Sequence, residues 1–127
     1  MSGGSSHSHA TAVSGPQVLV VALPGEIDFN NDGQVQDALT RALDNGTMVV
    51  VANGSGTSFC ASSGVTALLA AHRHAAAAGR QLRVAASPAM RRVLELIGAD
   101  HVLDTYPTLT AALAGQARPP AQPPSWR

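Results

Sequence analysis

The chain has 127 residues, enough to bury one hydrophobic core but not two, so we expect a single domain. Lysine and arginine together number 8, as do aspartate and glutamate, and only 13% of residues are charged, which excludes the basic face that nucleic-acid binding needs. No apolar run reaches the roughly 18 residues of a membrane-spanning helix, and residues 1–10 lack the hydrophobic segment of a signal peptide. Cys60 is the only cysteine, which excludes an internal disulfide and a cysteine-based zinc site and favours the reducing cytoplasm.

The two ends of the chain differ in composition from the middle. Residues 1–9 and 116–127 consist mainly of Gly, Ser, His, Pro and Gln, which bury too little apolar surface to offset the entropy lost on ordering. We expect both to be disordered tails, the second one proline-rich, with Trp126 exposed to solvent. Residues 10–115 are then expected to form the folded domain.

Between the tails, apolar runs of strand length alternate with segments of helical spacing. Residues 18–23 are continuously apolar and stop at Pro24 and Gly25, which is typical of a buried strand. Two further strands of this kind are expected at residues 48–52 and 82–85, and a weaker one at residues 11–13.

Helical spacing fills the intervening segments. In the first of them, Val35, Leu39 and Leu43 recur at intervals of four after a polar start. Strands that alternate with helices predict an α/β domain with a mostly parallel mixed sheet of about four to five strands and about four helices. The expected helices run from Asn31 or Asp32 as N-cap to Asn45, from Ser62 and Ser63 to Gly79, from Ser87 and Pro88 to Gly98, and, as a short last helix, from Leu109 to Leu113.

Four segments of the domain resemble a known family. They are Leu-Pro-Gly-Glu-Ile-Asp at 23–28, Ser-Gly-Thr-Ser-Phe-Cys-Ala-Ser-Ser-Gly at 55–64, Ala-Gly-Arg-Gln-Leu-Arg-Val at 78–84, and Ser-Pro-Ala-Met-Arg-Arg-Val-Leu-Glu-Leu-Ile-Gly at 87–98. In this order and spacing they are similar to the STAS domain of anti-sigma factor antagonists. The resemblance implies a bacterial cytoplasmic protein, not an enzyme, that binds an anti-sigma factor with serine kinase activity, releases a sigma factor and so regulates transcription.

The resemblance also implies a set of site residues. In the family, the partner kinase phosphorylates the first serine of the pair, which is Ser62 in this chain. Ala61 and Asn53 stand where the family usually has aspartates, and these two departures bear on the phosphorylation cycle. The candidate partner-binding residues are Gly25, Glu26, Asp28, Ala61, Ser62, Ser63 and Gly64.

Local chemistry offers structural roles for residues of this set and for their neighbour Cys60. Serine is a favoured N-cap, so we expect Ser63 to cap its helix while Ser62 presents a hydroxyl to the partner. A phosphate on Ser62 would lie at the positive end of a helix, which tolerates an anion, and would block a docked partner. Asp28 closes a glycine-led turn, where a carboxylate commonly bonds its own backbone. Cys60 lacks a basic neighbour and is expected to be a packing residue.

Catalytic and metal sites are not indicated. The chain contains neither the Gly-x-Ser-x-Gly of a nucleophile elbow nor a Walker phosphate loop, so we expect no catalytic residue. His72 and His74 point away from each other on a helix, and no further ligands have suitable spacing, so we expect no metal and no cofactor. The alternative function is a STAS-type scaffold that is never phosphorylated, or a regulatory domain that holds a small ligand or nucleotide near the helix start at Ser62. We expect a monomer or weak dimer with no nucleic-acid or membrane partner.

Overall fold

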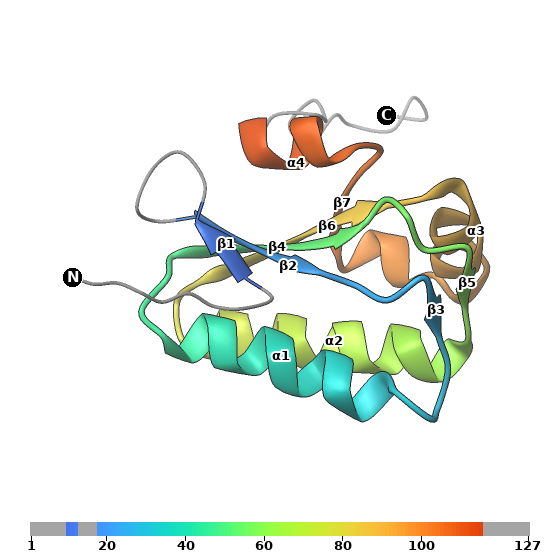
Figure 1. Ribbon diagram of the computed structural model, residues 1–127, viewed down its shortest axis with the longest axis horizontal. Coiled ribbons are helices and arrows are strands. Elements are labelled where there is room, and N and C mark those ends of the chain that lie inside the picture. Colours follow the sequence, from blue (N-terminus) through green and yellow to red (C-terminus); the bar gives the residue numbers. More distant parts are fainter. Residues whose placement is uncertain (1–9, 13–17, 116–127) are drawn as a thin grey trace, which may run out of the picture.

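The computed structural model describes residues 10–12 and 18–115, so the expected disordered tails lie outside the described ranges. In these ranges the segments of helical spacing form helices and the apolar runs form strands (Figure 1). The strands are β1 (Ala10–Ala12), β2 (Val18–Ala22), β3 (Glu26–Ile27), β4 (Val49–Gly54), β5 (Phe59–Cys60), β6 (Gln81–Ala86) and β7 (Asp104–Tyr106). The helices are α1 (Asp32–Asp44), α2 (Ser62–Ala77), α3 (Pro88–Ile97) and α4 (Leu109–Ala114), with a 3-10 helix, η2 (Ala99–His101).

The main sheet has five strands in the order β1-β2-β4-β6-β7. β1 is antiparallel to β2, and the other pairs are parallel, with Val20 opposite Val51 and Val51 opposite Arg83. β3 and β5 form a separate parallel pair. The described chain is a single α/β domain, so the prediction of a mostly parallel mixed sheet with about four helices is confirmed.

Helices cover both faces of the main sheet. α1 and α2 pack side by side against one face, α4 lies over the other, and α3 lies at the end of the sheet near β5 (Figure 1). Because side chains alternate along a strand, Val50 belongs to the core cluster beneath α1 and α2, whereas Val51 belongs to the cluster beneath α4. Burial on both faces explains why the strands are continuously apolar in sequence.

Three short strands carry no sequence pattern that predicts them. β3 and β5 have two residues each and β7 has three, which is too few for an alternating pattern to be recognised. β7 lies at the edge of the main sheet, and Tyr106 is its one buried residue. β3 and β5 are the strands that position the candidate site.

The ends of α3 follow the expected cap chemistry. Ser87 is the N-cap, and its Oγ accepts a hydrogen bond from Met90 N at 3.1 Å, with Pro88 in the first turn. Gly98 ends the helix with a φ of +88°, a conformation that favours glycine. At α1, Asn31 occupies the N-cap position as expected, but its side chain makes no capping hydrogen bond.

Candidate functional site at the start of α2

The start of α2 lies beside the turn at residues 25–28. β5 leads into α2, and it pairs in parallel with β3, so that Glu26 lies opposite Phe59. The Ala61 N–H then donates to the carbonyl oxygen of Ile27 at 2.8 Å. The structure therefore brings together two groups of candidate residues that are far apart in the sequence.

The first turn of α2 packs closely on this strand pair. Ile27 and Cys60 point inward and are 0% and 3% exposed. Gly64 faces them from α2, where an added Cβ would lie 2.7 Å from Ile27 Cγ2 and 2.9 Å from Cys60 Sγ. Only glycine permits this approach without displacing its neighbours. Gly64 is itself buried, so it supports the candidate surface from within.

Ser62 is the first residue of α2 and is exposed. Its carbonyl oxygen accepts a hydrogen bond from Thr66 Oγ1 at 3.2 Å. Within the described residues, the Ser62 hydroxyl itself has no hydrogen-bond partner. Modification of this hydroxyl would therefore break no structural hydrogen bond.

The N-cap of α2 is Ala61, and the prediction that Ser63 caps this helix is wrong. Ala61 has an extended backbone (φ −75°, ψ 163°), and its carbonyl oxygen accepts from the N–H groups of Gly64 and Val65 at 2.9 and 3.3 Å. Ser63 lies inside the helix, whereas an N-cap side chain must come from the non-helical residue before it. The buried Ser63 Oγ has no partner in the described part of the chain.

The first turn of α2 therefore has no negative charge of its own. No acidic residue lies in its first turn, and no side chain caps it. The first N–H groups of a helix point out of its N-terminus, and with the helix dipole they amount to about half a positive charge. An anion at Ser62 would lie close to these N–H groups.

Hydrogen bonds hold the acidic turn in a defined shape. Asp28 Oδ1 accepts from Asn30 N at 2.9 Å, which confirms the expected bond of this carboxylate to its own backbone. Asn31 Oδ1 accepts from Asp28 N at 3.0 Å, and Asn31 Nδ2 donates to the Glu26 carbonyl at 2.8 Å. The Asn31 side chain thus stabilises the turn instead of capping α1. Sequence spacing does not distinguish these two uses of an asparagine.

A second polar network fixes the loop before β5. The buried Thr57 donates from Oγ1 to the Pro24 carbonyl at 2.8 Å, and Ser87 Oγ donates to the Thr57 carbonyl. Asn53, one of the two departures from the family pattern, accepts at Oδ1 from Ser55 N at 3.2 Å and from Ser55 Oγ at 2.7 Å. The amide oxygen of Asn53 thus serves as the kind of acceptor that a carboxylate would also provide.

Cys60 is a packing residue, as expected. Burial raises the pKa of the Cys60 thiol above its ordinary value. The thiol therefore stays protonated at neutral pH, and its Sγ donates to the Ala61 carbonyl at 3.6 Å.

Both phenylalanines of the chain are exposed next to this surface. Phe29 follows β3 and is 79% exposed, and Phe59 lies in β5 and is 51% exposed. Aromatic side chains are enriched in the buried centres of protein interfaces. Neither phenylalanine was predicted from the sequence to belong to the site, since their exposure depends on the pairing of β3 with β5.

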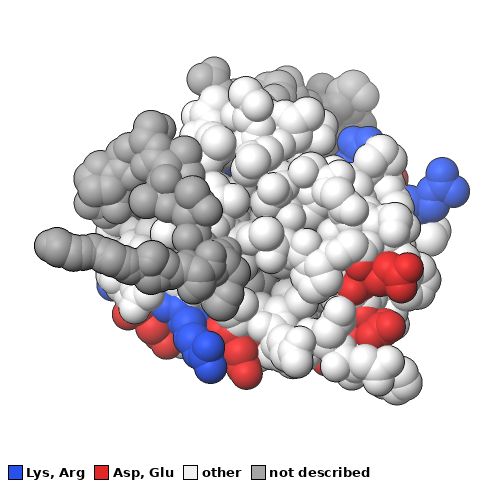
Figure 2. All heavy atoms as spheres, in the orientation of Figure 1, with Lys and Arg blue, Asp and Glu red and all other residues white. Residues whose placement is uncertain are grey.

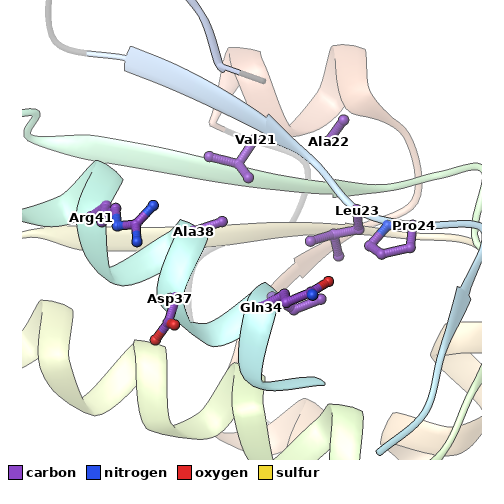
Figure 3. A pocket seen from close by; sticks show the side chains of 9 residues that line it. Val21, Ala22, Leu23, Pro24, Gln34, Asp37, Ala38 and Arg41 are labelled. Carbon is purple, nitrogen blue, oxygen red and sulfur yellow. The ribbon is translucent and has the colours of Figure 1, made fainter. Parts of the chain in front are cut away.

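Neither of two hollows on the described surface is lined by residues of α2. One of about 350 Å³ lies between β2 and α1, with an apolar wall from β2 and with Gln34, Asp37 and Arg41 on the α1 side (Figure 3). Its charged side chains have opposite signs, which does not suit the several phosphates of a nucleotide. Another hollow, of about 390 Å³, lies between β5 and α3.

The described ranges contain neither a candidate metal site nor a candidate membrane-spanning helix. Residues 10–12 and 18–115 contain no group of three or more His, Cys, Asp or Glu side chains that could hold a metal ion. Within the same ranges, no helix has the length and apolar character needed to cross a membrane.

Comparison with known proteins places the fold in one family. The model of the STAS domain matches residues 9–112. Among curated proteins, none matches the chain. An anti-sigma factor antagonist from Mycobacterium paratuberculosis is similar in structure, with 27% sequence identity and a TM-score of 0.69 over 84% of this chain and 91% of that chain.

Two other solved structures share the fold at lower identity. The Bacillus cell fate determinant SpoIIAA in its phosphorylated form is 24% identical, with a TM-score of 0.60 over 82% of this chain and 95% of that chain. A sulfate transporter family protein from Wolinella succinogenes is 20% identical, with a TM-score of 0.69 over 82% and 88%. Because the family model covers nearly all of the described residues, the chain belongs to the STAS domain family.

Proposed function

We propose that this protein is an anti-sigma factor antagonist whose activity is controlled by phosphorylation of Ser62. It binds an anti-sigma factor that is also a serine kinase, and the sigma factor is thereby released. It acts in the cytoplasm through protein contact and not as an enzyme. The observation that carries the proposal is the exposed hydroxyl of Ser62, which has no partner among residues 10–12 and 18–115, at a helix start that lies beside the acidic turn at residues 25–28. Similarity to the mycobacterial antagonist supports this class of partner.

A phosphate on Ser62 is compatible with the fold. It would bring between about −1.5 and −2 charges to the helix start. That start has no acidic residue and no capping side chain, so the phosphate meets free N–H groups and no repelling carboxylate of the same turn.

The same phosphate opposes binding of the partner. The proposed partner surface comprises the turn at residues 25–28, with the carboxylates of Glu26 and Asp28, and the helix start at residues 61–63. A partner docked on both parts would have to bury the phosphate beside these carboxylates. Burial of a charge without a matching cation is strongly unfavourable, so phosphorylation releases the partner.

The residues at the two departures from the family pattern, Ala61 and Asn53, are compatible with a phosphate on Ser62. Ala61 removes a carboxylate next to Ser62, which lessens repulsion of an incoming phosphate. Asn53 keeps an oxygen acceptor bonded to Ser55, so the loop before β5 retains its hydrogen bonds. With Ala61 and Asn53 in place, Ser62 is exposed.

The test is mass spectrometry of the protein after incubation with ATP and each serine-kinase anti-sigma factor of its host. We expect the mass to rise by one phosphate that peptide mapping assigns to Ser62, and the Ser62→Ala variant to stay unmodified. Ser63→Ala is the matched control and should still be phosphorylated, because the Ser63 hydroxyl is buried. Absence of phosphate with every active kinase would refute the phosphorylation cycle, and phosphate on Ser63 would refute the assignment of the site.

A second candidate function is a STAS-type scaffold or ligand-binding domain that is never phosphorylated. The observation in its favour is the hollow between β2 and α1, which is separate from Ser62 and has polar side chains at its rim (Figure 3). A ligand that binds only the folded state stabilises it by about 2.7 kcal/mol at 100 times its dissociation constant. A rise in melting temperature with a small metabolite other than a nucleotide, without phosphorylation by any kinase, would favour this function.

A further inference from the structure

The hollow between β5 and α3 lies next to the proposed phosphorylation site, because Cys60, which lines it, is two residues before Ser62. We call it the β5–α3 groove. Ser58, Phe59 and Cys60 line one side, and the first turns of α3, including Arg92 and Val93, line the other. The chain continues from Cys60 through Ala61 directly to Ser62, so a protein bound at the start of α2 is adjacent to the groove.

Phe59 forms an apolar wall of this groove that the protein itself does not cover. Alternation along β5 turns Cys60 inward, where it is 3% exposed, and Phe59 outward, where it is 51% exposed. Its neighbour across the strand pair is Glu26, which is also exposed. A half-exposed aromatic ring beside a hollow can contact an apolar side chain of a bound protein over a large area.

Arg92 supplies a free positive charge to the same groove. It is exposed, it is the one charged residue that lines the groove, and within the described residues it has neither a hydrogen bond nor an ion pair. Arg91 precedes it on α3, so its immediate neighbour has the same sign. Arginine is enriched at binding hot spots because its planar group pairs with carboxylates by two hydrogen bonds.

Acidic and basic side chains lie on opposite sides of Phe59 at this end of the molecule. β5 lies between β3, with which it pairs, and α3, with which it packs, so Phe59 lies between Glu26 on one side and Arg92 on the other. Figure 2 shows acidic atoms and basic atoms at this end of the molecule with uncharged surface between them. A partner bound at this end of the molecule would therefore contact the carboxylate of Glu26, then the ring of Phe59 and then the guanidinium group of Arg92.

We propose that the β5–α3 groove is a second contact for the anti-sigma factor, which inserts an apolar side chain against Phe59 and places a neighbouring carboxylate on Arg92. The inference rests on the proposed function and extends its surface from the start of α2 onto α3. Charge complementarity identifies the occupant, since a free arginine beside an apolar wall selects an acidic residue next to an apolar one. Glu26, on the far side of Phe59, selects a basic residue of the same partner.

The experiment is calorimetric titration of the unphosphorylated protein with each serine-kinase anti-sigma factor of its host. Arg92→Glu and Phe59→Ala should each weaken binding about tenfold or more. The loss caused by Arg92→Glu should shrink as salt is raised, because it is electrostatic. Arg73→Glu is the matched control: it reverses an exposed arginine on α2 about 16 Å along the helix from Ser62, and it should change affinity by less than about twofold.

The outcomes separate the groove from the proposed function. If Ser62→Asp abolishes binding while Arg92→Glu and Phe59→Ala bind like the wild type, the groove is not a contact and the proposed function stands. If Arg73→Glu weakens binding as much as Arg92→Glu, the effect is one of overall charge and the groove is again refuted. If the wild-type protein binds none of the kinases, both proposals fail. Melting temperatures within a few degrees of the wild type exclude misfolding, since Phe59 and Arg92 are exposed.

Discussion

Two helices of this protein begin at serines, and the molecule uses the two hydroxyl groups in opposite ways. Ser87, the N-cap of α3, is 6% exposed; its Oγ accepts from Met90 N and donates to the Thr57 carbonyl. Ser62, the first residue of α2, is exposed and has no hydroxyl partner in the described ranges. In these two helices, the serine hydroxyl has a structural role where the backbone places it at the N-cap and none, within the described ranges, where it follows the N-cap.

The comparison also explains why regulation is proposed at one helix start and not the other. A phosphate on Ser87 would have to replace two buried hydrogen bonds, one that caps α3 and one that holds its start to the loop before β5. A phosphate on Ser62 replaces none. The start of α3 is therefore part of the scaffold, and the start of α2 is available to a kinase and a partner.

The largest expected effect on stability comes from replacement of Gly64, which allows the first turn of α2 to pack closely on β3 and β5. Gly64→Ala places a methyl group within 3.0 Å of Ile27 and Cys60, so we expect a loss of about 2–3 kcal/mol in the free energy of unfolding. Urea denaturation measures it. Gly33→Ala in α1 is the control, since an added Cβ there has no neighbour within 4 Å and stability should be unchanged or higher. Equal stability of both variants would contradict the close packing at Gly64.

Removal of the structural serine has the next largest effect. Ser87→Ala deletes the cap of α3 and leaves the Thr57 carbonyl without its side-chain donor, so it should lower the free energy of unfolding by about 1–2 kcal/mol. The midpoint of urea unfolding should fall with an unchanged slope. A loss no larger than that of Ser62→Ala would contradict the difference between the two helix starts.

Addition of the missing cap to α2 should stabilise the protein. Ala61→Asp places a carboxylate at the N-cap position, where it accepts from the first turn and interacts with the helix dipole, for a gain of about 1 kcal/mol. Thermal unfolding measures the gain. Ala61→Asn tests the hydrogen bond without the charge, and its advantage over the wild type should not depend on salt. A loss of stability with both variants would show that Ala61 is not the N-cap.

The smallest effect is expected at the proposed phosphorylation site itself. Ser62→Ala removes a hydroxyl that has no partner in the described part of the chain, so stability should change by less than about 0.5 kcal/mol. The same variant should lose all phosphorylation by the partner kinase. A drop in stability as large as that of Ser87→Ala would indicate that the Ser62 hydroxyl has a structural role.

The long elements could be predicted because their patterns repeat over several residues. Continuous apolar runs located β2, β4 and β6, and helical spacing located α1, α2 and α3. Ser87, Pro88 and Gly98 marked both ends of α3, because each residue type has a local conformational preference that its neighbours did not oppose. The strands β3 and β5 could not be located, since two residues form no pattern.

By itself the sequence determined the α/β fold class, a helix that starts near the Ser62–Ser63 pair and the local bond of the Asp28 carboxylate. Only the tertiary structure decided that Ala61 is the N-cap and that the acidic turn lies beside Ser62. It also decided that Phe59 and Arg92 line one groove. The physical reason is that these features depend on the pairing of β3 with β5 and the packing of α3 on β5, which join segments that are distant in the chain. A local pattern reports the preferences of neighbouring residues, and contacts between distant segments are set by the core that all of them share.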